Sequence, residues 1–213
     1  MIIRNVILDW SGTLVDDLTP VLKTTNHVLA ECGLPAISLD EFRREFCLPI
    51  RKFYERRTPG VPQEKLEQIF LAKYREHQGE ITLLPHTKEF LEFCVHGGIG
   101  VYIGSTVDTH TYEYQSKRFD IGRYITKPYI GIVDKTEAIH DILEDNRLDR
   151  DQTMFVGDME HDIEAGKAGG IHTCAVLTGY NHVEKLRAMA PDLVCRDLGE
   201  LQQILSEQLA SCG

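Results

Sequence analysis

This sequence predicts an α/β fold in which helices cover both faces of a parallel sheet, with a helical unit inserted after the first strand. Short apolar runs bounded by turn residues alternate with segments of helical periodicity. The runs are apolar throughout, which is typical of parallel strands that are buried on both faces. One block, from about residue 18 to residue 78, contains no convincing strand pattern and indicates the separate unit.

The predicted strands and helices alternate along the rest of the chain. Five runs are predicted as strands: residues 2–8, 101–104, 154–157, 173–177 and 193–195. Apolar residues share one helix face near 90–95 and again near 138–143. The last helix is predicted to begin with a capping box from Asp197 to Glu200.

The block without strands is predicted to fold as a small lid. It contains three amphipathic helices: residues 18–29, a segment that opens with the capping box Ser38 to Glu41, and residues 66–74. Hinges are expected near 15–17 and 81–85. The predicted division is therefore a core of residues 1–16 and 82–213 and a helical domain of residues 17–81.

Composition narrows the class of protein. The 213 residues are 42% hydrophobic and 26% charged, which suits a globular protein with one core and a smaller module. The 23 basic and 33 acidic residues give a net charge of -10 without a basic stripe, so no nucleic-acid partner is expected. No membrane span or signal peptide is expected, and we predict a cytoplasmic monomer or homodimer. The six cysteines lack C-x-x-C spacing and are expected to be free thiols.

Polar side chains follow three of the predicted strands. Asp9 follows the first, Ser105 and Thr106 follow the strand at 101, and Asp158 follows the strand at 154. Parallel strands bring their carboxyl ends to one edge of a sheet, where ligands bind. Two carboxylates at that edge repel each other unless a cation or a proton lies between them. Oxygen ligands that leave room for water and phosphate favour Mg²⁺.

A phosphoryl-transfer site is the chemistry that this set of residues predicts. With a divalent cation neutralising the phosphoryl group, one Asp9 oxygen attacks phosphorus and forms an aspartyl-phosphate, which water hydrolyses. A positive side chain is needed to balance charge on the transferring group. Lys135, in the segment VDKTEAI, is the best placed candidate.

Four segments, in this order, resemble the four motifs of the haloacid dehalogenase-like (HAD) hydrolase superfamily: DWSGTL, IGSTV, VDKTEAI and FVGDMEHDIEAGKAGG. The stretches ECGLPAISLDEF and LPIRKF resemble the helical cap of its phosphoglycolate phosphatase-like branch. The resemblance spans the chain. It implies a Rossmann-like core with a small cap domain, and a hydrolase that acts on a small phosphorylated metabolite.

The resemblance also implies a role for each motif residue. Asp9 would be the nucleophile, and Mg²⁺ would be held by Asp9, Asp158 and the backbone carbonyl of Ser11. Asp162 would support the metal without being a direct ligand. Ser105 would bind the phosphate, with Thr106 as the alternative, and Lys135 would be the cation of the third motif.

Ser11 departs from the motif, because phosphatases of this superfamily usually carry a second aspartate at that place as general acid and base. General acid-base catalysis is worth roughly 10²- to 10⁴-fold, so we expect that loss unless another residue replaces it. His161, Asp16 and Asp17 are the candidate replacements.

Two alternatives follow from Ser11. Phosphonoacetaldehyde hydrolase-like enzymes also lack the second acid and use a cap lysine to form a Schiff base, for which Lys52, beside Arg51, is the candidate. A regulatory or near-inactive phospho-ligand-binding protein is the other. The cap is locally basic, which would suit an anionic substrate; its basic residues are Arg43, Arg44, Arg51, Lys52, Arg56 and Arg57.

Overall fold

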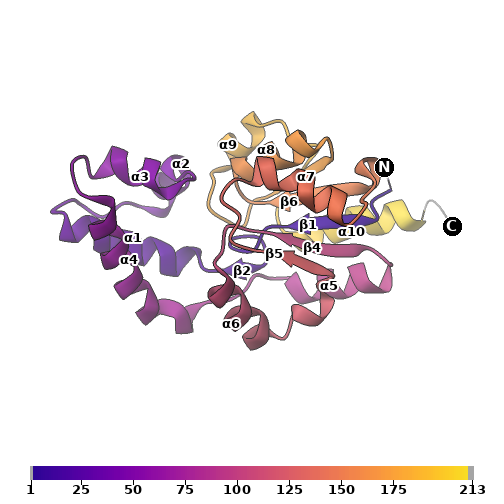
Figure 1. Cartoon of the computed structure of the whole chain (residues 1–213), viewed down its shortest axis with the longest axis horizontal. Helices are drawn as coiled ribbons and strands as arrows, with labels where there is room; N and C mark the ends of the chain where they lie inside the picture. The colour runs from indigo at the N-terminus through magenta and orange to yellow at the C-terminus, as the bar shows by residue number, and fades with distance from the viewer. Residues whose placement is uncertain (1, 211–213) are drawn as a thin grey trace.

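The computed structural model describes residues 2–210, apart from the side chain of Leu209, and its centre is a parallel six-stranded sheet (Figure 1). The strand order is β5-β4-β1-β6-β7-β8, and every neighbouring pair is parallel. The strands are β1 (Asn5–Leu8), β4 (Gly100–Gly104), β5 (Lys127–Tyr129), β6 (Thr153–Gly157), β7 (His172–Val176) and β8 (Leu193–Cys195). The predicted α/β fold is confirmed, although β5 was missed because Lys127 and Pro128 are exposed edge residues without an apolar pattern.

Six helices cover the two faces of the sheet. They are α5 (Thr87–His96), α6 (Thr109–Phe119), α7 (Lys135–Asp145), α8 (Glu160–Gly169), α9 (Val183–Ala188) and α10 (Leu198–Ala210). Alternate residues of β1 point to opposite faces: Leu8 packs with Leu91 and Leu201, whereas Ile7 packs with Ile139. Short 3-10 turns at Gln78–Glu80, Gly122–Tyr124 and Arg150–Gln152 complete the connections. Burial of both sheet faces explains the continuously apolar strands.

Four helices form a separate unit beside the sheet, seen at the left of Figure 1. They are α1 (Leu18–Glu31), α2 (Leu39–Glu45), α3 (Ile50–Arg57) and α4 (Gln63–His77). The prediction of three helices in this block was wrong, because it missed α3. This helix lacks a clear apolar face: it carries charges at five of its eight positions and buries only Phe53 and Tyr54. The rings of Phe42, Phe46 and Phe53 lie 4.7 to 5.8 Å apart and form the core of this unit. The capping box of Ser38 and Glu41 is present.

A two-stranded antiparallel ribbon joins the helical unit to the sheet. Strand β2 (Val15–Asp16) pairs with β3 (Thr82–Leu83), at the positions where hinges were expected. The hydroxyl of Thr87 also donates to the backbone oxygen of Leu14 at 2.9 Å. This bond links the two chain segments that connect the helical unit to the sheet. Neither strand was predicted, because two residues are too few to show an alternating pattern. The exact division at residues 17 and 81 stays a prediction.

The described cysteines are free thiols: Cys32, Cys47, Cys94, Cys174 and Cys195. Cys174 and Cys195 lie on the neighbouring strands β7 and β8, with their sulfur atoms 3.7 Å apart. Cys212 lies outside the described residues. Among residues 2–210, no helix has the length and apolar composition needed to cross a membrane.

Candidate active site

The functional side chains meet at the carboxyl edge of the central strands. Asp9 follows β1, Ser105 follows β4 and Asp158 follows β6, while Lys135 is the first residue of α7. All four side chains are buried, with exposed fractions between 0% and 5%. They converge because β1 lies between β4 and β6 in the sheet. The predicted meeting of strand ends is therefore present in the structure.

Lys135 is held between two carboxylates. Its Nζ donates to Asp9 Oδ1 at 2.7 Å and to Asp162 Oδ1 at 2.6 Å. Burial alone would lower the pKa of Lys135, but the charges of Asp162 and Asp9 outweigh burial and raise the pKa above its ordinary value. Lys135 is therefore a fixed positive charge beside the Asp9 carboxylate.

Three buried carboxylates surround this lysine. Asp9, Asp158 and Asp162 each place an oxygen within 4.8 Å of the others. Burial, together with the charges of Asp9 and Asp162, raises the pKa of Asp158 well above its ordinary range. Three carboxylates and one ammonium leave two negative charges without partners when all are ionised. A divalent cation bound here would supply that charge, and oxygen ligands of this kind suit Mg²⁺.

Each of the two acids that follow β6 accepts hydrogen bonds on both of its oxygens. Asp162 uses both oxygens within the protein, since Oδ1 accepts from Lys135 and Oδ2 accepts from the Met159 backbone amide at 2.9 Å. Asp158 accepts from Thr13 Oγ1 at 3.1 Å and from the Tyr180 backbone amide at 2.6 Å. Thr13 and Tyr180 thus position Asp158. Thr13 lies in the segment DWSGTL, Tyr180 lies in none of the four motif segments, and only the fold brings the two residues to this carboxylate.

Two glycines allow the backbone to approach Asp158 closely. Gly12 has a φ of 77°, and a Cβ there would lie 2.5 Å from Asp158 Oδ2. A Cβ on Gly179 would overlap the same carboxylate. Both positions therefore require glycine, and Gly12 requires it for its backbone conformation as well.

A cavity of about 330 Å³ opens above these groups. Five of the predicted residues line its floor: Asp9, Ser11, Ser105, Thr106 and Lys135. The Oγ of Ser105 accepts from the Val107 amide at 3.3 Å, which leaves its proton available for a ligand. Asp9 Oδ2 has no hydrogen-bond partner in the part of the chain that the structure describes, so it is available to react. Volume and lining are those of a small-molecule site.

Asp17 is the one candidate replacement for the missing acid that lines this cavity. It is 4% exposed, and Tyr180 donates its hydroxyl to Asp17 Oδ1 at 2.9 Å. Burial raises the pKa of Asp17 to about 6, against the opposing effect of hydrogen bonds from Ser11 and Tyr180. Asp16 lies in β2, and His161 Nε2 accepts from the Lys135 backbone amide at 3.3 Å. Neither of these two residues lines the cavity.

The structure does not bring Arg51 and Lys52 to the cavity. Arg51 pairs with Glu55 at 2.9 Å, and its side chain is 68% exposed. Lys52 lies in a separate groove, whose other residues include Glu160 and Lys185. The expectation that these two side chains bind substrate finds no support in this arrangement.

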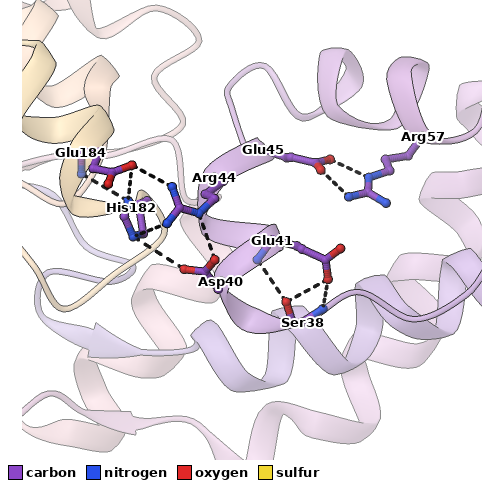
Figure 2. A network of polar contacts seen from close by, with 8 residues as sticks. All are labelled: Ser38, Asp40, Glu41, Arg44, Glu45, Arg57, His182 and Glu184. Atoms are coloured by element: carbon purple, nitrogen blue, oxygen red, sulfur yellow. Dashed lines mark hydrogen bonds and ion pairs between the residues drawn. The ribbon is translucent and has the colours of Figure 1, made fainter.

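Several of the other basic residues hold the helical unit together or attach it to the core (Figure 2). Arg44 donates to Asp40 at 2.9 Å and to Glu184 at 2.7 Å, and Arg57 pairs with Glu45. The contact between Arg44 and Glu184 reaches the segment after β7, which also carries Tyr180.

The segment after β7 and the helical unit are also joined by hydrogen bonds from side chains to backbone oxygens. Arg43 Nε donates to the Gly179 oxygen at 2.8 Å, and Asn181 and Lys185 both donate to the Phe46 oxygen at 3.1 and 2.9 Å. The helical unit is therefore docked over the same segment that positions Asp158.

Known proteins are similar to this chain in sequence. Residues 6–176 match the model of the family described as haloacid dehalogenase-like hydrolase. The chain is 24% identical to pyrophosphatase PpaX of Oceanobacillus iheyensis, over 99% of this chain and 100% of that protein. It is 23% identical to phosphoglycolate phosphatase 1 of Pseudomonas aeruginosa, over 93% of this chain and 78% of that protein.

The fold matches solved structures along nearly its whole length. A haloacid dehalogenase-like family protein, SP0104 from Streptococcus pneumoniae, superposes with a TM-score of 0.80 at 22% sequence identity. The match covers 95% of this chain and 98% of that one. At this identity the similarity establishes the shared fold.

Proposed function

This chain belongs to the haloacid dehalogenase-like hydrolase family, and on that premise we propose that it is a Mg²⁺-dependent phosphatase acting through an aspartyl-phosphate on Asp9. The substrate is a small phosphorylated metabolite. The observation that carries the proposal is the Asp9 carboxylate beside the buried Lys135, with Nζ 2.7 Å from Oδ1, at the floor of the cavity. This pair places a nucleophile and a charge for the phosphoryl group side by side.

The donor set at the sheet edge fits Mg²⁺. Asp9, Asp158 and the backbone carbonyl of Ser11 would hold the ion, and Asp162, whose Oδ1 accepts from Lys135 Nζ at 2.6 Å, would position Lys135. The bound ion would neutralise charge on the phosphoryl oxygens. Asp9, Asp158, Asp162 and Lys135 together carry two net negative charges when all are ionised. This charge favours a divalent ion over a monovalent one.

The chain's own residues perform the transfer. The free Asp9 oxygen attacks phosphorus, the bond from phosphorus to the ester oxygen breaks, and the leaving alkoxide takes a proton from a water molecule. Lys135 neutralises a phosphoryl oxygen, and the Ser105 hydroxyl donates to another. Water then attacks the aspartyl-phosphate, which releases phosphate and restores the Asp9 carboxylate. The helical unit would act as the cap that excludes bulk water from the cavity.

Ser11 limits the proton transfers in this scheme. A hydroxyl protonates a leaving alkoxide poorly near neutral pH, so esters with good leaving groups should react best. The same residue favours a second candidate function, a regulatory protein that binds a phosphorylated ligand and turns it over slowly. The phosphonoacetaldehyde hydrolase-like alternative requires a cap lysine in the cavity, and Lys52 does not line it.

Phosphate release from p-nitrophenyl phosphate and acetyl phosphate tests the proposal. Both have good leaving groups, so we expect turnover that requires Mg²⁺ and is lost in the near-isosteric variant Asp9→Asn. Thermal unfolding of Asp9→Asn controls for folding. Absence of Asp9-dependent release from either compound would reject the phosphatase and favour the ligand-binding protein.

A further inference from the structure

The upper part of the cavity is apolar. The helical unit supplies six of its lining residues: Val21, Phe46, Leu48, Ile50, Phe70 and Tyr74. The rings of Phe70 and Tyr74 stack at 5.5 Å with 21° between their planes. Met159 and Tyr180 extend this wall from the core side. The part of a bound ester that lies beyond the phosphate therefore contacts hydrocarbon and aromatic surface.

Positive charge is confined to the floor of the cavity. Lys135 is the one cationic residue among the described residues that line it, and its ammonium is already shared by Asp9 and Asp162. The other charged lining residues are the acids Asp9, Asp17 and Asp108.

The basic residues of the helical unit do not change this balance. Arg43 donates to Gly179, Arg44 to Asp40 and Glu184, and none of the unit's arginines or lysines lines the cavity in residues 2–210. A second anionic group on the substrate would have to lose its water shell without gaining a counter-charge.

We propose that this site selects phosphate esters whose leaving group is uncharged and largely apolar, and that it discriminates against leaving groups that carry a second negative charge. The inference rests on the proposed phosphatase function and names its substrate class. It predicts that neither phosphoglycolate nor pyrophosphate, the compounds in the names of the two relatives, is a preferred substrate. At 23% and 24% identity, the residues that line the cavity are free to differ from theirs.

Competitive inhibition by two phosphonates tests this without depending on leaving-group chemistry. The compounds 2-phenylethylphosphonate and 3-phosphonopropionate cannot be hydrolysed and mimic benzyl phosphate and phosphoglycolate. With p-nitrophenyl phosphate as reporter, we expect the phenyl compound to bind roughly 10- to 100-fold more tightly, because the carboxylate lacks a partner. Equal binding, or tighter binding of 3-phosphonopropionate, would overturn the inference.

A charge added to the apolar wall should reverse this preference. Phe70 is half-buried and lines the cavity, whereas the next residue, Leu71, is 55% exposed and does not line it. In Phe70→Arg the ratio of the two inhibition constants should move by at least about 10-fold toward 3-phosphonopropionate. The matched control Leu71→Arg should keep the wild-type ratio. An unchanged ratio in Phe70→Arg, with cooperative thermal unfolding retained, would count against the inference.

The two proposals fail in different ways. Without Asp9-dependent release of p-nitrophenol, the phosphatase function itself fails. With that release intact, a preference for 3-phosphonopropionate in the wild-type protein overturns only the substrate class. Benzyl phosphate and 2-phosphoglycolate both lose an alkoxide, so their turnover by the wild-type protein then gives an independent ranking, in which kcat/KM should be higher for benzyl phosphate.

Discussion

Asp17→Asn should stabilise the protein at neutral pH, and the gain should depend on pH. The Asp17 carboxyl is buried, and its pKa rises from 3.8 to about 6 on folding. A rise of about two pKa units corresponds to roughly 3 kcal/mol of unfolding free energy. The folded protein keeps the Asp17 proton at pH values where the unfolded chain has released it. The free energy of unfolding therefore falls as pH rises from about 4 to about 6 and then stays at its lower value.

The amide that Asp17→Asn introduces has no proton to release and needs no charge to be buried. We expect the difference in unfolding free energy, variant minus wild type, to be roughly 3 kcal/mol larger at pH 7.5 than at pH 4. Urea unfolding in EDTA between pH 4 and pH 8 measures it, because EDTA removes any divalent ion whose charge would alter Asp17. Tyr180→Phe removes a hydrogen bond that lowers the Asp17 pKa, so the loss of stability should extend to higher pH. A difference that is constant with pH, or that shrinks as pH rises, would refute the reasoning.

Three further substitutions address the site. Ser11→Asp should raise turnover of alkyl phosphates by up to roughly 10²-fold while changing acetyl phosphate turnover little, measured as kcat; no gain would show that another residue already supplies the proton. Lys135→Met leaves Asp9 and Asp162 buried without their cation, so the free energy of unfolding, measured with urea in EDTA, should fall by roughly 3 to 5 kcal/mol. Added Mg²⁺ should restore part of this free energy. Gly12→Ala places a methyl group 2.5 Å from an Asp158 oxygen at a φ of 77°, so Mg²⁺ affinity measured by calorimetry should fall; unchanged affinity would contradict the assigned role of Asp158.

The central sheet could be predicted because each of its buried strands is an apolar run between turn residues. The same rule placed Asp9, Ser105 and Asp158 at one edge before any contact was known. The elements that were missed lack such a signal. Strand β5 lies at the edge of the sheet with two exposed residues, and β2 and β3 have two residues each. Pairing with neighbours, and not local sequence, determines these strands.

The supporting residues of the site could not be predicted from spacing. Thr13 and Tyr180 contact Asp158 across 145 and 22 positions of the chain, and nothing in either residue type indicates a carboxylate partner. Asp17 was one of three candidate acids, and its burial beside Tyr180 is what separates it from Asp16 and His161. Such contacts depend on how the helical unit and the segment after β7 meet.

The basic residues of the helical unit show that local charge in a sequence does not by itself predict an anionic ligand. A cluster of arginines suggests an anionic ligand only if the side chains face the ligand, and sequence does not give their direction. In this protein Arg43 and Arg44 donate to the segment after β7, and Arg57 pairs within the helical unit. Arg43 and Arg44 therefore hold the helical unit on the core, while the residues of α1 to α4 that line the cavity are apolar. The ligand's charge follows from the residues that line the cavity, where Lys135 alone, among those described, is positive.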